Sequence, residues 1–264
     1  MSATARKRLI QEYYSRRAKN YDKQKIRTWK SKQGFGDEVF SKLINSLTGL
    51  EGKPVLEVCM GTGRTSLPFL RKISPWLVGL DLSKEMLKVA KEKMCPFKER
   101  ISLILGDAEN LPFGDGAFDA LICTSAMHYF GYPEKSLAEF SRVLREKGVF
   151  VYGDLTLHEL DEQGFLDRLE RTVSLAHKNY FRPSEMRKML EDNGFRASCA
   201  DTVAYRKAFN YLIEDKGRYF GVKPEAINEC VRAASPDERK LYSLSNDEIT
   251  LFYTLIKTIK KGKL

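Results

Sequence analysis

The residues best suited to bind a cofactor lie in the segment Val55–Gly63, VLEVCMGTG. It begins as an apolar run containing one acid, Glu57, and it ends in a turn with Gly61 and Gly63. Glycine lets the backbone approach a ligand that a β-carbon would push away. The helix expected next, Arg64 to about Lys72, presents its free N–H groups at the same place. The pattern therefore predicts a strand and a turn that cradle a nucleotide-like cofactor.

A second acid, Asp81, ends the next apolar run, Trp76–Leu80. From the tip of a neighbouring strand, a carboxylate can accept hydrogen bonds from both hydroxyls of a ribose. A dinucleotide-binding turn is the competing interpretation, but its G-x-G-x-x-G fingerprint needs a third glycine where this chain has Ser66. The sequence thus disfavours a nicotinamide cofactor.

Three further segments continue the alternation of strands and helices. LILGDAENLPF, Leu103–Phe113, predicts a third strand that ends in Asp107 and Ala108. A fourth strand is expected over Ala117–Cys123, before the loop TSAMHYF, and Arg142–Asp154 predicts a helix end, a turn and a fifth strand. Alternation of this kind is typical of a parallel sheet covered on both faces.

In order and spacing, these segments resemble the class I S-adenosylmethionine (SAM) methyltransferases, and more narrowly the ubiquinone and menaquinone C-methyltransferase branch. YYSRRAKNYD, Tyr13–Asp22, resembles the tyrosine-bearing helix that leads into that branch. The resemblance covers roughly residues 10–200 and is specific for the cofactor rather than for the substrate. It implies SAM as the cofactor.

The resemblance also implies a role for each residue near the cofactor. Glu57 would orient the amino group of the methionine moiety, and Asp81 would bind the ribose hydroxyls. A helix cap is the alternative role for Asp81, as a turn residue is for Asp107. The remaining residues would line the methionine end (Gly61, Gly63, Ser125), cover the adenine (Leu82), read its edge (Asp107, Ala108) or wall the site from above (Tyr21, with Tyr14 as a further candidate).

Cys59 departs from the family, which usually has glycine at this position. A side chain fits if the φ angle of Cys59 stays negative, and it then narrows the wall beside the methionine end. We expect an effect on cofactor affinity rather than on cofactor identity.

Methyl transfer from SAM is an in-line displacement in which positioning and desolvation supply most of the catalysis. A general base is useful when the acceptor is a phenolic carbon or a hydroxyl, and His128 and His158 are the candidates. A structural role is the alternative for each histidine. Thiol, thiolate and amine acceptors need neither, so carbon, nitrogen, oxygen and sulfur all stay open as the accepting atom.

The composition fits one α/β domain with an elaboration: 264 residues, 42% of them hydrophobic. The five cysteines are scattered without C-x-x-C spacing, so neither a disulfide framework nor a metal site is predicted. No window approaches about 18 consecutive apolar residues, and the N-terminus lacks a signal-peptide pattern. We therefore expect a cytoplasmic protein without a transmembrane segment.

Positive charge is concentrated in residues 1–33, which carry a net charge of +9 out of +10 for the whole chain. In the resembled family this arm folds over cofactor and substrate. Its cations could attract an anionic substrate, an acidic lipid surface or RNA, or they could simply form a solvated helix face.

The expected fold is a Rossmann-like seven-stranded sheet, mostly parallel with an antiparallel last strand, preceded by an N-terminal cap helix. Residues 1–33 form a basic lid segment and 34–264 a methyltransferase domain, in which a helical insertion of about 206–246 either lids the substrate site or makes a homodimer interface. Helices are expected over 4–20, 35–48, His158–His177 and Pro183–Asn193. Strands are expected near 54–59, 76–81, 101–106, 118–124, 148–154, 196–204 and 248–258.

The sequence therefore predicts a SAM-dependent methyltransferase that acts on a small, anionic or partly apolar molecule. Methylation of RNA or protein is the alternative that the basic arm favours. A non-catalytic SAM-binding regulatory or scaffold protein is the alternative from another class, and Cys59 is its best support.

Overall fold

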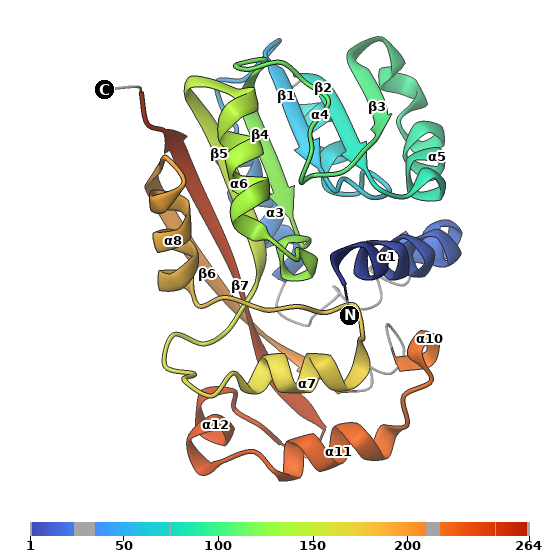
Figure 1. The fold of residues 1–264 in the computed structure, drawn as a ribbon, viewed down its shortest axis with the longest axis vertical. Helices are drawn as coiled ribbons and strands as arrows, with labels where there is room; N and C mark the ends of the chain where they lie inside the picture. The colour runs from blue at the N-terminus through green and yellow to red at the C-terminus, as the bar shows by residue number, and fades with distance from the viewer. Residues whose placement is uncertain (1, 24–34, 74, 210–216, 246, 263–264) are drawn as a thin grey trace.

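The computed structural model describes residues 2–23, 35–73, 75–209, 217–245 and 247–262. Seven strands form one sheet in the order β3-β2-β1-β4-β5-β7-β6 (Figure 1). Strand β7 runs antiparallel to β5 and β6, and the other neighbours are parallel, which confirms the predicted fold class. The strands are β1 (Pro54–Val58), β2 (Trp76–Asp81), β3 (Ile101–Leu105), β4 (Phe118–Thr124), β5 (Leu144–Thr156), β6 (Phe195–Ala208) and β7 (Glu248–Lys260).

Helices cover both faces of the sheet because successive strand residues point to opposite sides. On one face Val55 and Ile122 pack with α3 (Phe35–Ser46) and α4 (Ser66–Lys72). On the other, Leu56 and Leu121 pack with α6 (Pro133–Val143) and α8 (Pro183–Asp192). The remaining elements before the insertion are α1 (Ala3–Arg17), η1 (Ala18–Asn20), α5 (Lys84–Lys93), η2 (Cys95–Arg100), η3 (Met127–Tyr129), α6 (Pro133–Val143), α7 (Phe165–Val173) and α8 (Pro183–Asp192).

The helix predicted over His158–His177 is much shorter in the structure, where α7 covers only Phe165–Val173. The Asp161 carboxylate accepts the backbone N–H groups of Gly164 and Phe165 at 2.8 and 2.9 Å. Because this side chain satisfies the free donors at the start of a helix, it fixes the start of α7. Strand β6 in turn extends beyond its predicted end, since its pairing with β7 continues to Ala208.

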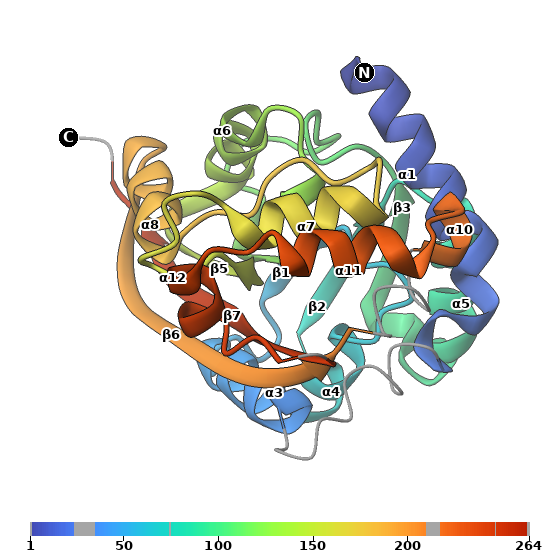
Figure 2. The ribbon, with the colours of Figure 1, turned by 90° about the horizontal axis from the view of Figure 1, so that it is seen from below.

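The segment between β6 and β7 carries α10 (Arg218–Phe220), α11 (Pro224–Arg232) and α12 (Pro236–Leu241). Figure 2 shows α11 alongside α7, and α10 beside α1. The Tyr13 ring of α1 lies 4.8 Å from the ring of Tyr219 and 5.4 Å from that of Phe220. Part of the predicted insertion, residues 210–216, lies outside the described residues. Within the described ranges, no helix is long and apolar enough to cross a membrane.

Candidate active site

The turn after β1 requires glycine at two positions. Gly61 and Gly63 have φ angles of 58° and 68°, in the left-handed region. A β-carbon on Gly63 would also lie 2.0 Å from the terminal methyl carbon of Met94. Backbone hydrogen bonds hold the turn, from Met60 N–H to the Leu80 carbonyl at 3.1 Å and from Gly63 N–H to the Met60 carbonyl at 3.0 Å.

Asp81, at the end of β2, joins this turn to the start of α5. One carboxylate oxygen accepts the N–H of Gly61 at 2.7 Å, and the other accepts the N–H of Ser83 at 2.8 Å. Burial raises the pKa of Asp81, against the effect of these backbone hydrogen bonds. The helix cap is Ser83, whose hydroxyl accepts the N–H of Met86 at 3.2 Å. Ser83 therefore caps α5, while the Asp81 carboxylate connects the glycine turn to the start of that helix.

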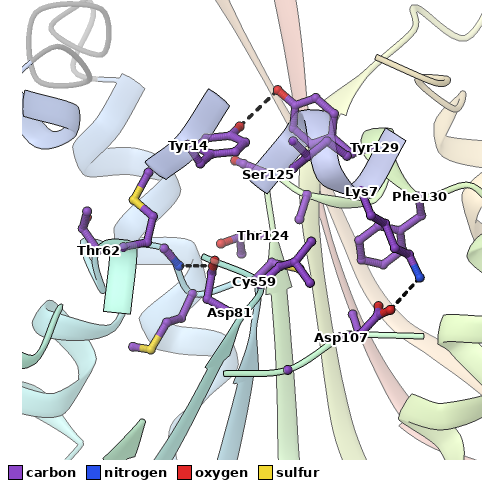
Figure 3. A pocket seen from close by; sticks show the side chains of 18 of the residues that line it. Lys7, Tyr14, Cys59, Thr62, Asp81, Asp107, Thr124, Ser125, Tyr129 and Phe130 are labelled. Atoms are coloured by element: carbon purple, nitrogen blue, oxygen red, sulfur yellow. Dashed lines mark hydrogen bonds and ion pairs between the residues drawn. The ribbon is translucent and has the colours of Figure 1, made fainter. Parts of the chain in front are cut away.

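A cleft at the carboxyl ends of the parallel strands holds about 1060 Å³ of atom-free space, part of it open to solvent (Figure 3). Its lining includes most of the residues that the sequence placed at a cofactor: Tyr14, Tyr21, Gly61, Asp81, Leu82, Asp107, Ala108 and Ser125. Residues that the sequence analysis did not single out also line it, among them Arg6, Lys7, Thr62, Arg64 and Phe130.

Glu57 and Gly63 are not among the lining residues. The Glu57 side chain is buried behind the turn, where its carboxylate accepts the hydroxyl hydrogen of Ser66. Burial raises the pKa of Glu57 to about 8, although the Ser66 hydrogen bond and Arg64 lower it. The hydrogen bond to Ser66 links the end of β1 to the start of α4.

Cys59 lines the cleft, but its φ angle is +55°, so the prediction of a negative φ is wrong. Left-handed backbone is costly for a residue with a β-carbon, and such conformations cluster at functional sites. The buried Cys123 thiol is hydrogen-bonded to Cys59, and this contact together with burial raises the pKa of Cys123 well above its usual value. The Cys123 thiol therefore stays protonated behind Cys59.

Helix α1 lies across the carboxyl ends of the strands (Figure 1), and its side chains Lys7 and Tyr14 line the cleft (Figure 3). Lys7 Nζ lies 2.6 Å from an Asp107 oxygen and 2.7 Å from a Glu109 oxygen. Burial lowers the pKa of Lys7, but the hydrogen bonds to the two carboxylates outweigh it and raise the pKa overall. One turn onward, the Gln11 amide donates to the Leu82 carbonyl at 3.0 Å.

Two further contacts complete the closure from α1 and the residues after it. The Tyr14 hydroxyl donates to the Tyr129 hydroxyl at 3.0 Å. The Thr62 hydroxyl donates to Asp22 at 2.6 Å, next to the ion pair between Asp22 and Lys93. The arm is therefore attached to the segments that follow β1, β2, β3 and β4.

The two candidate bases lie outside the cleft lining. His128 is buried, with Nδ1 2.9 Å from both oxygens of Asp154 and its ring 4.0 Å from that of Tyr129. His158 donates its backbone N–H to the Tyr242 hydroxyl at 3.1 Å, and its ring lies 5.0 Å from that of Phe252. A catalytic role for either histidine stays a prediction. The His128 ring packs against the Tyr129 ring, which lines the cleft. In the described part of the chain, no group of three or more metal-ligating side chains comes together.

Comparison with known proteins agrees with this geometry. A methyltransferase-domain family model matches residues 55–148, which contain the glycine turn, Asp81 and Asp107. An uncharacterized protein of Methanocaldococcus jannaschii is 30% identical over 58% of this chain and 69% of its own length. An uncharacterized methyltransferase of Bacillus subtilis is 35% identical over 53% of this chain and 55% of its length. A demethylmenaquinone methyltransferase of Desulfitobacterium hafniense is 26% identical over 70% of this chain and 74% of its length.

Solved structures show the same fold at lower identity. The YcgJ protein of Bacillus subtilis has a TM-score of 0.74 at 23% identity and covers 86% of this chain and 100% of its own. The geranyl diphosphate C-methyltransferase of Streptomyces coelicolor, solved with S-adenosyl-L-homocysteine, has a TM-score of 0.62 at 13% identity, over 86% of this chain and 79% of its own. The matching domain and the related sequences identify this chain as a SAM-dependent methyltransferase, and the solved structures show the shared fold.

Proposed function

We propose that the cleft binds SAM and that the enzyme transfers its methyl group to a small molecule. The observation that carries the proposal is the joint position of Asp81 and Gly61, linked at 2.7 Å in the wall of a cleft large enough for a nucleoside cofactor. Bound SAM would supply an electrophilic methyl group on a sulfonium leaving group. The chain's own contribution is to hold the reactants in line and to exclude water.

Each cleft residue then has a distinct part in binding. Asp81 accepts the ribose hydroxyls, while Leu82 covers the adenine and Asp107 and Ala108 lie at its edge. Gly61 and Ser125 face the methionine end. Tyr21 walls the site from above. Glu57 and Gly63 do not line the cleft, and the role that the family resemblance implies for Glu57 stays a prediction.

Stabilisation by S-adenosylhomocysteine tests the proposal directly. At a hundredfold excess over its dissociation constant, this product should raise the free energy of unfolding by about 2.7 kcal/mol, because it binds only the folded state. Urea unfolding with and without the ligand measures the shift. NADH is the control, and a shift with NADH but none with S-adenosylhomocysteine or SAM would contradict the proposal.

We also propose that α1 acts as a lid whose hold on the cleft depends on Lys7. Replacing Lys7 with alanine leaves the Asp107 and Glu109 carboxylates without their cation, and the Glu109 side chain is only 6% exposed. We expect affinity for S-adenosylhomocysteine to fall about tenfold, because charge-assisted hydrogen bonds at a partly screened site are worth about 1.4 kcal/mol.

Arg8→Ala is the matched control for Lys7→Ala, since it removes the same charge from the next residue, which is exposed. Titration calorimetry should show less than a twofold change for this variant. Equal losses of affinity in both variants would mean that the net charge of the arm matters rather than its attachment.

A small-molecule acceptor fits the arm better than RNA does. Several arm cations are used inside the protein: Arg6 donates to the Ala176 and His177 carbonyls at 3.2 and 3.0 Å, and Arg16 lies over the Tyr219 ring. Residues 24–33 of the basic arm lie outside the described residues. The contact of α10 with α1 favours a lid role for the insertion over a homodimer interface. Relatives named for demethylmenaquinone and for phthiotriol dimycocerosates act on small molecules or lipids, in line with a partly apolar acceptor.

A further inference from the structure

Helix α1 carries two neighbouring rows of side chains, each made of residues four positions apart, which lie on one side of a helix. The first row, Lys7, Gln11 and Ser15, binds the segments after β2 and β3. Besides the ion pairs of Lys7, the Gln11 amide donates to the Leu82 carbonyl at 3.0 Å, and the Ser15 hydroxyl donates to Glu85 at 2.7 Å. The first row therefore attaches the helix to the protein.

The second row, Arg6, Ile10 and Tyr14, lines the cleft and is called the lid row below. It is joined to the segment after β4, because the Tyr14 hydroxyl donates to the Tyr129 hydroxyl at 3.0 Å (Figure 3). Phe130 of the same segment also lines the cleft. The proposed function assigns none of these five residues to SAM, so they border space that remains for the methyl acceptor.

The contact between Tyr14 and Tyr129 places the lid row toward the reacting group. Under the proposed function Ser125 faces the methionine end of SAM, which carries the methyl group. Tyr129 follows Ser125 by four residues in the segment after β4. A methyl acceptor must reach the methyl group in line with the sulfonium. The lid row and the segment after β4 therefore enclose the side of the cleft that an acceptor needs.

Arg6 gives this side of the cleft a positive charge. Its Nη1 donates to the Ala176 and His177 carbonyls at 3.2 and 3.0 Å, which holds the guanidinium in place but supplies no negative charge. Among the described residues no acid forms an ion pair with Arg6, whereas Lys7 has two, and the hydrogen bonds of the Arg6 side chain use Nη1 alone. The other guanidinium donors can bind a carboxylate or a phosphate.

Arg64 is the other arginine that lines the cleft, and it lies on the α3 side. Its guanidinium carbon is 5.4 Å from the centre of the Phe40 ring. Burial raises the pKa of Glu57, and the Arg64 charge acts against that increase. The charge of Arg64 thus acts on groups of the protein itself, which leaves Arg6 as the better partner for an anionic ligand.

We propose that the methyl acceptor carries a carboxylate or phosphate that binds Arg6, and that its apolar body packs along Ile10 and Phe130. This inference rests on the proposed function, because it uses SAM in the cleft to identify the reacting side. It makes Arg6 a specificity-determining residue of helix α1.

Fluorine NMR tests the proposal on the full chain, with each variant saturated with S-adenosylhomocysteine. The probes are 4-fluorobenzoate and 4-fluorobenzamide, which differ in charge but little in shape. The wild type should bind the carboxylate about fivefold more tightly than the amide, because a charged acceptor strengthens the hydrogen bonds from a guanidinium. Arg6→Gln should bind both probes equally. Ile10→Ala should weaken both about threefold, because both use the same apolar contact.

Two further measurements sharpen the test. 4-Fluorophenyl phosphate distinguishes the two head groups, since the one that Arg6 recognises should lose more affinity in Arg6→Gln. Arg8→Gln is the matched control, because Arg8 is the exposed cation two positions along α1, and its removal should leave the preference for the anion unchanged.

Several outcomes would overturn the proposal. They are equal binding of anionic and neutral probes to the wild type, absence of saturable binding, and a preference that survives in Arg6→Gln. Equal weakening of all probes in Arg6→Gln would mean that Arg6 only attaches the helix, and loss of the preference in Arg64→Gln alone would place the anion at α4. Unchanged binding in Ile10→Ala would contradict the apolar contact. Failure of the wild type to bind S-adenosylhomocysteine in calorimetry instead overturns the proposed function.

Discussion

Replacing Glu57 with glutamine should remove a loss of stability that the wild-type protein shows as the pH rises from about 4.5 to about 8. Over this interval the folded protein holds the Glu57 proton while the unfolded chain releases it. The contribution to stability is therefore complete below the unfolded pKa and is lost as the pH rises through the folded pKa. The slope reaches about 1.4 kcal/mol per pH unit, so the difference across the interval amounts to a few kcal/mol.

Urea unfolding at several pH values between 4.5 and 8 measures this difference. Glutamine keeps the size of the side chain and an oxygen for the Ser66 hydroxyl, so the fold should be retained. Glu12→Gln, at an exposed position of α1, removes an equivalent carboxyl and should follow the wild-type curve. Parallel curves for Glu57→Gln and the wild type would show that Glu57 is ionised in the folded protein.

The positions of the strands along the chain could be predicted from the sequence, because each apolar run is short and bounded by turn residues. Glycines with a required positive φ were also recognisable at Gly61 and Gly63. The conformation of Cys59 was not, since a left-handed cysteine is disfavoured locally and is held by the surrounding turn and by Cys123. The start of α7 had a local signal, Asp161 before Gly164, which the apolar pattern of the region obscured.

The lid contacts illustrate a second limit of the sequence-based prediction. The sequence analysis considered residues 1–33 by their net charge, so it did not distinguish Lys7 from the other cations. Lys7, Gln11 and Tyr14 recur at helical spacing on one face of α1, and that periodicity could have identified them as the side facing the cleft.

Replacing Asp81 with alanine should weaken binding of S-adenosylhomocysteine about 10- to 100-fold, equivalent to about 1–3 kcal/mol. The substitution removes the charged acceptor for the ribose hydroxyls. It also frees the Gly61 N–H, which Asp81 now holds at 2.7 Å, and so loosens the turn that faces the ligand. A charged acceptor makes stronger hydrogen bonds than a neutral one. The affinity of Asp81→Asn for S-adenosylhomocysteine should therefore lie between those of Asp81→Ala and the wild type.

Titration calorimetry of the Asp81 variants measures the loss, with Asp192→Ala as the control for net charge. Asp192 ends α8, away from the cleft, and its carboxylate pairs with Lys188 at 2.9 Å, so its removal should leave the dissociation constant within twofold of the wild type. Melting curves without ligand separate a folding defect from a binding defect. An unchanged constant in Asp81→Ala would mean that Asp81 only ties the glycine turn to α5, because a carboxylate bound to ribose cannot be removed without a loss of affinity.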